Sequence, residues 1–157
     1  MADESFVSLF WPADNPAITA HISMLQGIIN RLAGNSASCK TWCLTLVGAL
    51  VSFAGATHTP AVVTFTLVPV VIFGLLDTMY LAQEEAYRSL FNRVVEAIRR
   101  REYRIGNVFE AHAAVGLSGF FNALFSWSVL PVYLGLATMY GVARWFGWLE
   151  LFTSAKG

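Results

Sequence analysis

An acidic and a basic residue stand at the two ends of a long stretch without other charges. Residues 41–76 contain no Asp, Glu, Lys or Arg; Lys40 precedes this stretch and Asp77 follows it. A carboxylate next to a long apolar segment is costly unless it is hydrated, paired or part of an ion pathway. Asp77 is therefore interpreted in one of two ways. It is an interface residue, solvated or paired with Lys40, or it is an ion-path or gating residue.

Three polar residues are spaced four apart within a second uncharged run, residues 111–143. These are Ser118, Asn122 and Ser126, and on one helix they would form a polar stripe. Such a stripe could line a pore or a ligand groove. It could equally form hydrogen bonds between helices, which is the commoner use of these residues in lipid.

Four arginines form a basic cluster at positions Arg99, Arg100, Arg101 and Arg104. The cluster is interpreted either as a solvated helix end or as a patch that binds an acidic partner, a nucleotide or a nucleic acid. It lacks the interleaved aromatic residues on which single-stranded nucleic acids stack, so no specific nucleic acid binding is predicted.

No set of residues indicates catalysis, a metal site or another cofactor. His21, His58 and His112 lie on three different segments, so they do not form a metal set. Cys39 and Cys43 are expected to be reduced, small apolar residues. The sequence contains no P-loop, no G-x-S-x-G motif and no H-E-x-x-H motif. The chain is therefore not predicted to be an enzyme.

The composition places these residues in a membrane protein. Hydrophobic residues make up 56% of the 157 residues and charged residues 13%, whereas soluble domains have about 45–50% and about 25%. One small soluble core could not bury this much apolar surface. A secretory signal is not expected, because Asp3 and Glu4 stand where such a signal carries basic residues.

The first expected helix is amphipathic and covers residues 16–33. Asn15 followed by Pro16 is a typical helix start, and apolar residues then recur every three or four positions. Gly34 and Asn35 are expected to stop this helix. Ser36 would then cap the first membrane helix, which runs to about residue 57. In that helix Gly48, Ser52 and Ala56 are small residues four apart, a spacing that allows close helix packing in lipid.

The second membrane helix is expected to start at residue 60 and to continue beyond the membrane to residue 102. Pro69 is expected to kink it. The pairs Glu84–Arg88 and Glu96–Arg100 have the favourable i,i+4 order. A helix of this length would extend for roughly 65 Å, which is about twice the ~30 Å hydrocarbon core of a bilayer.

The run at 111–143 is too long for one membrane helix. It is expected to form either a surface-lying segment followed by one span or a short hairpin broken near Pro131, and the first alternative is favoured. The prediction is thus an all-α membrane protein with about three transmembrane helices. It is organised as an N-terminal segment and amphipathic cytoplasmic helix (residues 1–35), a transmembrane hairpin (36–82), a cytoplasmic helical extension (83–106), and an interfacial segment, third transmembrane helix and tail (107–157).

Two stretches of this sequence resemble a known group of proteins. The first is His21-Ile22-x-Met24-Leu25-Gln26-x-Ile28-Ile29-Asn30-Arg31-x-Ala33-x-Asn35-Ser36 followed by Lys40-x-Trp42, and the second is Leu76-Asp77-x-x-Tyr80-Leu81-x-x-Glu84-x-x-Tyr87-Arg88-x-Leu90-Phe91. Both resemble a family of small, mostly uncharacterised bacterial inner-membrane proteins, suspected to be accessory or effector subunits of anti-phage defence systems. The resemblance implies a polar switch layer at the inner membrane face, made of Asn30, Arg31, Asn35, Lys40, Asp77, Tyr80, Glu84 and Arg88.

The leading functional hypothesis is an oligomeric inner-membrane effector or sensor subunit. Its cytoplasmic helices would receive a signal or a soluble defence protein, and its membrane helices would then form a pore or perturb the bilayer. The alternative is a non-conducting membrane anchor or scaffold for a soluble defence enzyme, and a weaker alternative is a small ion-coupled transporter that uses Asp77. The basic residues before the first span and after the second place the N-terminus in the cytoplasm.

Overall fold

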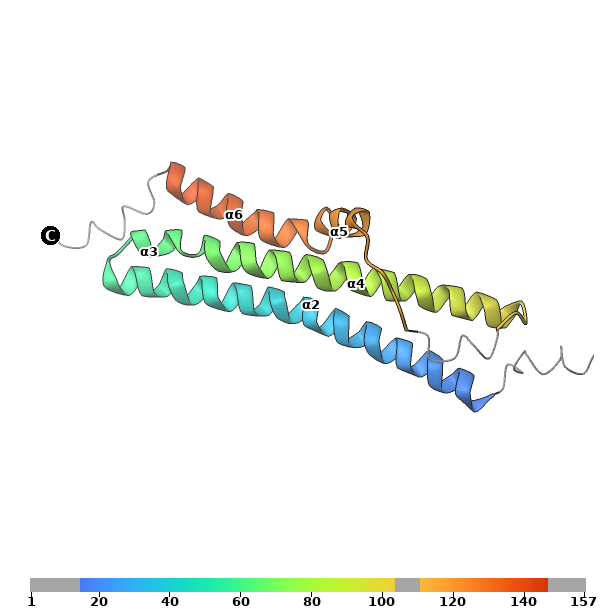
Figure 1. The fold of residues 1–157 in the computed structure, drawn as a ribbon. Helices are drawn as coiled ribbons and strands as arrows, with labels where there is room; N and C mark the ends of the chain where they lie inside the picture. The colour runs from blue at the N-terminus through green and yellow to red at the C-terminus, as the bar shows by residue number, and fades with distance from the viewer. Residues whose placement is uncertain (1–14, 104–110, 147–157) are drawn as a thin grey trace, which may run out of the picture.

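The computed structural model describes residues 15–103 and 111–146, and within these ranges the fold is helical without strands. The helices are α2 (Pro16–Thr57), α3 (Ala61–Thr64), α4 (Leu67–Arg99), α5 (Leu117–Leu124) and α6 (Leu130–Trp145). Helices α2 and α4 run antiparallel over most of their length, and α6 lies along α4 at the end where α2 turns into α3 (Figure 1). The described residues do not include Arg104 of the predicted basic cluster, the segment 1–14 or the tail after residue 146.

Helix α2 is one continuous helix of 42 residues, so the predicted stop at Gly34 and Asn35 is wrong. Asn15 does cap the helix as expected, because its side chain accepts a hydrogen bond of 2.9 Å from the Ala17 amide. A glycine inside a helix costs only about 1 kcal/mol. Burial of Leu32, Ser36 and Cys39 on the stripe that faces α4 outweighs this cost.

The second predicted helix is interrupted between α3 and α4. Pro69 was expected to kink the chain, and the break lies one turn earlier, at residues 65–66. Proline has no amide hydrogen to donate to the carbonyl four residues before it, and its ring crowds that carbonyl. The Phe65 carbonyl instead accepts a hydrogen bond of 3.1 Å from the Val68 amide. At its other end α4 stops at Arg99 rather than at residue 102, and Arg101 has a positive φ of 58°.

The two halves of the bundle expose different surfaces. Among the described residues, all of the exposed large apolar side chains except Val95 lie within residues 42–79 and 115–146. The exposed residues of 16–36 and 80–102 are mostly polar or charged. Two helical stretches, Pro16–Thr57 and Ala61–Arg99, are long and apolar enough to cross a membrane. Only 17% and 39% of their most apolar windows are buried within the chain, whereas the core helix of a soluble protein is mostly buried.

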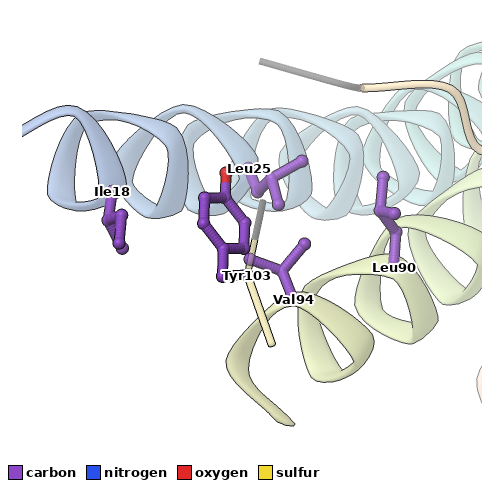
Figure 2. Close-up of a cluster of buried hydrophobic side chains, with 5 residues drawn as sticks. All are labelled: Ile18, Leu25, Leu90, Val94 and Tyr103. Atoms are coloured by element: carbon purple, nitrogen blue, oxygen red, sulfur yellow. The ribbon is translucent and has the colours of Figure 1, made fainter. Parts of the chain in front are cut away.

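The polar half, which we call the stalk (residues 16–36 and 80–103), has a small apolar core of its own. Ile18 and Leu25 of α2 pack against Leu90 and Val94 of α4. Tyr103, which follows α4, covers this core, and its hydroxyl points toward α2 (Figure 2). There the Tyr103 hydroxyl lies 2.6 Å from Nδ1 of the buried His21. The end of α4 is thereby tied to the beginning of α2.

The uncharged run at 111–143 contains two helices separated by a turn at residues 125–129. Helix α5 has eight residues and α6 has sixteen, so α6 is about 24 Å long at 1.5 Å per residue. Tyr133 near its start packs against Gly74 of α4, and the Tyr140 hydroxyl lies 3.2 Å from the Thr64 hydroxyl of α3. Helix α6 therefore runs antiparallel to α4 along the apolar half only. Its arrangement matches a short segment followed by one helix.

Candidate functional site

The charged residues that end the first uncharged run meet in the structure. Lys40 Nζ lies 2.9 Å from Oδ1 and 2.6 Å from Oδ2 of Asp77, so the ammonium group contacts both carboxylate oxygens. The Ser36 hydroxyl donates a hydrogen bond to Oδ1 of Asp77. It also accepts a hydrogen bond of 3.1 Å from Lys40 Nζ. We call Ser36, Lys40 and Asp77 the polar clamp, since they join α2 to α4. The pairing of Lys40 with Asp77 that the sequence predicted is thus present.

Helical spacing explains how the polar clamp forms. Ser36 and Lys40 are one turn apart on α2, so both side chains reach the same point on α4. Asp77 belongs to the buried stripe of α4, together with Gly74 and Thr78. Ser36 was interpreted as a helix cap from the sequence, but α2 is continuous there. Its side chain is therefore free to bond across to Asp77.

The polar clamp lies in a water-poor environment. The Asp77 side chain is fully buried, whereas the Lys40 side chain is 21% exposed. Burying a single charge costs several kcal/mol, and the cost is recovered only when the partner charge and hydrogen bonds are well placed. Each charge thus makes the burial of the other tolerable. The clamp fixes the register of α2 against α4 at the boundary between the apolar half and the stalk.

Tyr133 brings α6 to the same site. Its ring packs on Gly74, and its hydroxyl group lies near the Asp77 carboxylate. The hydroxyl oxygen is buried and lacks a well-formed hydrogen bond within the described residues. The sequence does not predict a role for Tyr133 at this site, because nothing local in it connects this residue with Asp77. Only the docking of α6 on α4 brings the two residues together.

The other predicted switch residues are not gathered into one layer. Glu84 is buried and pairs with Arg88 over 2.7 Å. Asn30 and Arg88 line a separate groove of about 430 Å³ on the stalk, with Gln26, Ile29, Phe91 and Asn92. Arg31 is exposed, and Asn35 and Tyr80 are half-buried. The residues that the resemblance assigns to one switch layer are therefore divided between the polar clamp and separate positions on the stalk.

Three further groups of predicted site residues are placed by the structure. Ser118 and Asn122 are exposed on α5, but Ser126 follows the end of this helix, so the expected single polar stripe is not formed. Gly48, Ser52 and Ala56 are exposed on α2, and none of the described residues lies within 4 Å of a Cβ atom placed at Gly48. Arg99 and Arg100 both contact Glu96, at 3.1 and 2.7 Å, which offsets part of the basic charge. Arg101 is exposed beside them.

No cluster of three or more His, Cys, Asp or Glu suited to a metal ion occurs among the residues in 15–103 and 111–146. Both cysteines are buried thiols. The chemistry of the site is therefore that of one buried ion pair with two hydroxyl groups beside it. Such a site can hold helices together or respond to a change of charge.

Comparisons with family models, curated proteins and solved structures find no match to this chain. The fold and the site define a helical protein with two helices capable of spanning a membrane and a buried ion pair between them.

The docking of α6 depends on the absence of a side chain at Gly74. A Cβ atom at this position would lie 3.3 Å from Cγ of Tyr133, so Gly74→Val is expected to push Tyr133 and α6 away from α4. Overpacking of this kind costs about 1–3 kcal/mol. Thermal unfolding in detergent measures the loss. Gly135→Val is the matched control, because nothing lies within 4 Å of a Cβ atom there. Equal stability of the two variants would contradict the docking.

Proposed function

We propose that this chain is a multi-pass inner-membrane protein with a cytoplasmic stalk, and that it works as an oligomeric effector or sensor subunit. The proposal rests on one observation, the change from an apolar to a polar protein surface at the polar clamp. Exposed apolar side chains cover one half of the bundle and polar side chains cover the other. In this proposal α2, α3–α4 and α6 cross the bilayer, and the stalk extends into the cytoplasm.

An exposed face of α2 supports assembly into an oligomer. Small residues recur on this face at intervals of three, four or seven positions, from the stalk to the end of the apolar half. They are Ser23, Gly27, Gly34, Ser38, Thr41, Thr45, Gly48, Ser52 and Ala56, all exposed. Small residues at helical spacing let helices approach closely in lipid, where packing rather than hydrophobicity drives association. A copy of the same chain is the partner that this proposal assigns to the face.

The proposed action follows from the rigid connection between the two halves. The same two helices form the stalk core and the apolar half, and the polar clamp fixes their register between them. A partner or ligand that moves the stalk helices would therefore shift the membrane helices, and the oligomer would open a pore or disturb the bilayer. Participation in anti-phage defence is the part of this proposal that rests on the resemblance of residues 21–42 and 76–91.

One observation favours the alternative of a non-conducting anchor for a soluble partner. The stalk carries an open groove of about 710 Å³ whose lining contains three arginines and three glutamates, Arg88, Arg93, Arg100, Glu85, Glu96 and Glu102. A mixed-charge surface of this kind suits a protein partner with complementary charges. Asp77, in contrast, is already neutralised by Lys40, which gives the transporter alternative less support.

Reconstitution in liposomes tests the proposed function. We expect the protein to be a multimer by mass measurement in detergent and to release an entrapped ion once its activator is supplied. Gly48→Val, a change on the small-residue face of α2, should shift the multimer toward monomer and lower the release at least several-fold. Gly135→Val on α6 is the control. A protein that stays silent with every candidate partner present, yet remains in the membrane, would favour the anchor.

A further inference from the structure

Helix α5 has an exposed apolar side, an exposed polar side and a side that packs on α4. At 100° per residue, Leu117 and Phe121 share the apolar side, and Phe125 follows directly after the helix; all three are exposed, Leu117 by 81% and Phe125 by 68%. Ser118 and Asn122 share the neighbouring polar side and are also exposed. Ala123, on the remaining side, is fully buried. A short helix with this division is suited to a boundary between two media.

The position of α5 along α4 agrees with such a boundary. A groove of about 300 Å³ lies between α4 and the start of α5, and its lining residues on α4 are Met79, Ala82 and Gln83. These lie two to six residues beyond Asp77 on the stalk side, which corresponds to about 3–9 Å along the helix. Interfacial helices lie about 5–10 Å into the headgroup and acyl boundary. The apolar groove thus continues the exposed apolar surface of α4 past the polar clamp by about one turn.

The turn after α5 adds an aromatic anchor. Trp127 is 93% exposed, and tryptophan is enriched at membrane–water interfaces, where its ring is apolar and its N–H group finds water or headgroups. Residues 111–143 contain no Asp, Glu, Lys or Arg, so this connection offers no charges to a charged protein partner. If this connection stayed in water, its exposed apolar surface would raise the free energy by about 25 cal/mol for each Å² compared with burial.

We propose that α5 and the turn at residues 125–129 form an in-plane membrane anchor in the cytoplasmic leaflet, with lipid acyl chains against Leu117, Phe121, Phe125 and Trp127. Ser118 and Asn122 then face the headgroups and water. This inference rests on the proposed membrane location of the chain. It adds that the polar clamp lies at or below the depth of the headgroups, since α5 lies against α4 on the stalk side of Asp77. The partner of this surface is therefore lipid and not a second copy of the chain.

Tryptophan fluorescence with quencher-labelled lipids tests the anchor. Two full-length variants each keep one described tryptophan, Trp127 or Trp42, with the other tryptophans replaced by phenylalanine. Each is reconstituted in vesicles whose phosphatidylcholine carries bromine either near the headgroup or near the chain end. We expect Trp127 to lose at least half of its emission with the shallow bromine and less with the deep one. Aqueous acrylamide should quench it only weakly.

Trp42, exposed on α2 next to Lys40, separates failure of the anchor from failure of the membrane location. Quenching of Trp42 by brominated lipid, together with strong quenching of Trp127 by acrylamide alone, would overturn the anchor. If brominated lipid quenches Trp42 but neither brominated lipid nor acrylamide quenches Trp127, then protein rather than lipid covers α5. This result would also overturn the anchor. If neither tryptophan responds to brominated lipid, the membrane location itself is wrong.

A matched pair of substitutions on α5 provides a second measurement. Phe121→Asp places a charge on the apolar side, and Asn122→Asp places the same charge on the polar side one residue later. We expect the first substitution to reduce the lipid quenching of Trp127 by about half and the second to leave it unchanged. Circular dichroism confirms that each variant keeps its helices. Equal quenching in the two variants would contradict the proposed orientation of α5.

Discussion

Replacing Lys40 with methionine is expected to destabilise the protein by about 3–5 kcal/mol, because the buried carboxylate of Asp77 loses its counter-ion. The expectation depends on the full burial of Asp77 and on the short contacts of 2.6 and 2.9 Å that Lys40 makes with its two oxygens. The Ser36 hydroxyl would still donate a hydrogen bond to Oδ1, but Oδ2 would lose its short contact with the ammonium group. Denaturant or thermal unfolding of the detergent-solubilised protein measures the effect.

Two companion variants make this first prediction specific. Lys40→Met combined with Asp77→Leu removes both charges, and replacing a buried ion pair by apolar residues of similar size is often nearly neutral. The double variant should therefore recover most of the lost stability. Arg100→Met removes one partner of the exposed Glu96–Arg100 pair at the end of α4, and surface pairs contribute little. If Lys40→Met and Arg100→Met cause equal losses of stability, the Lys40–Asp77 ion pair does not hold α2 and α4 together.

Leu25→Ala is expected to cost about 2–5 kcal/mol, the usual range for truncating a buried leucine. Leu25 is fully buried between Leu90, Val94 and Tyr103, in the core of the stalk (Figure 2). The loss should be local, since this core is separate from the packing of Cys43, Val70 and Tyr133 in the apolar half. We expect hydrogen exchange to accelerate in residues 16–33 and 85–99, while residues 43–54 stay protected.

The control for the stalk prediction is Ser23→Ala, an exposed change two residues away on the same helix. It should leave exchange unchanged. Uniformly faster exchange along the whole of α2 in Leu25→Ala would show that the two halves unfold as one unit. In that case the stalk core and the apolar half would form one cooperative unit, which would contradict the expected local loss.

Much of the helical framework follows from the order of residues alone. The apolar stripe from Ile18 to Leu32, the cap at Asn15 and the turn near residues 57–60 are local features, and all are present. The pairing of Lys40 with Asp77 was also predictable, since two charges at the ends of one uncharged hairpin must lie at the same level. The end of the first amphipathic helix was not predictable. Gly34 favours a local stop, whereas the packing of α2 against α4 favours a continuous helix, and this packing cannot be seen in the sequence.

The sequence by itself determined the helical class, the two long apolar stretches and the charges at their ends, because these depend on periodicity and composition over short distances. Only the tertiary structure decided that α2 continues through Gly34, that Ser36 bonds to Asp77, and that Tyr133 approaches the same carboxylate. It also decided that the small residues of α2 face outward and that Ser126 leaves the stripe of Ser118 and Asn122. The physical reason is that the local preference of a glycine to interrupt a helix is worth only about 1 kcal/mol. Burial of a whole helix face stabilises the protein by more than this. Which face is buried depends on the helices that pack against it.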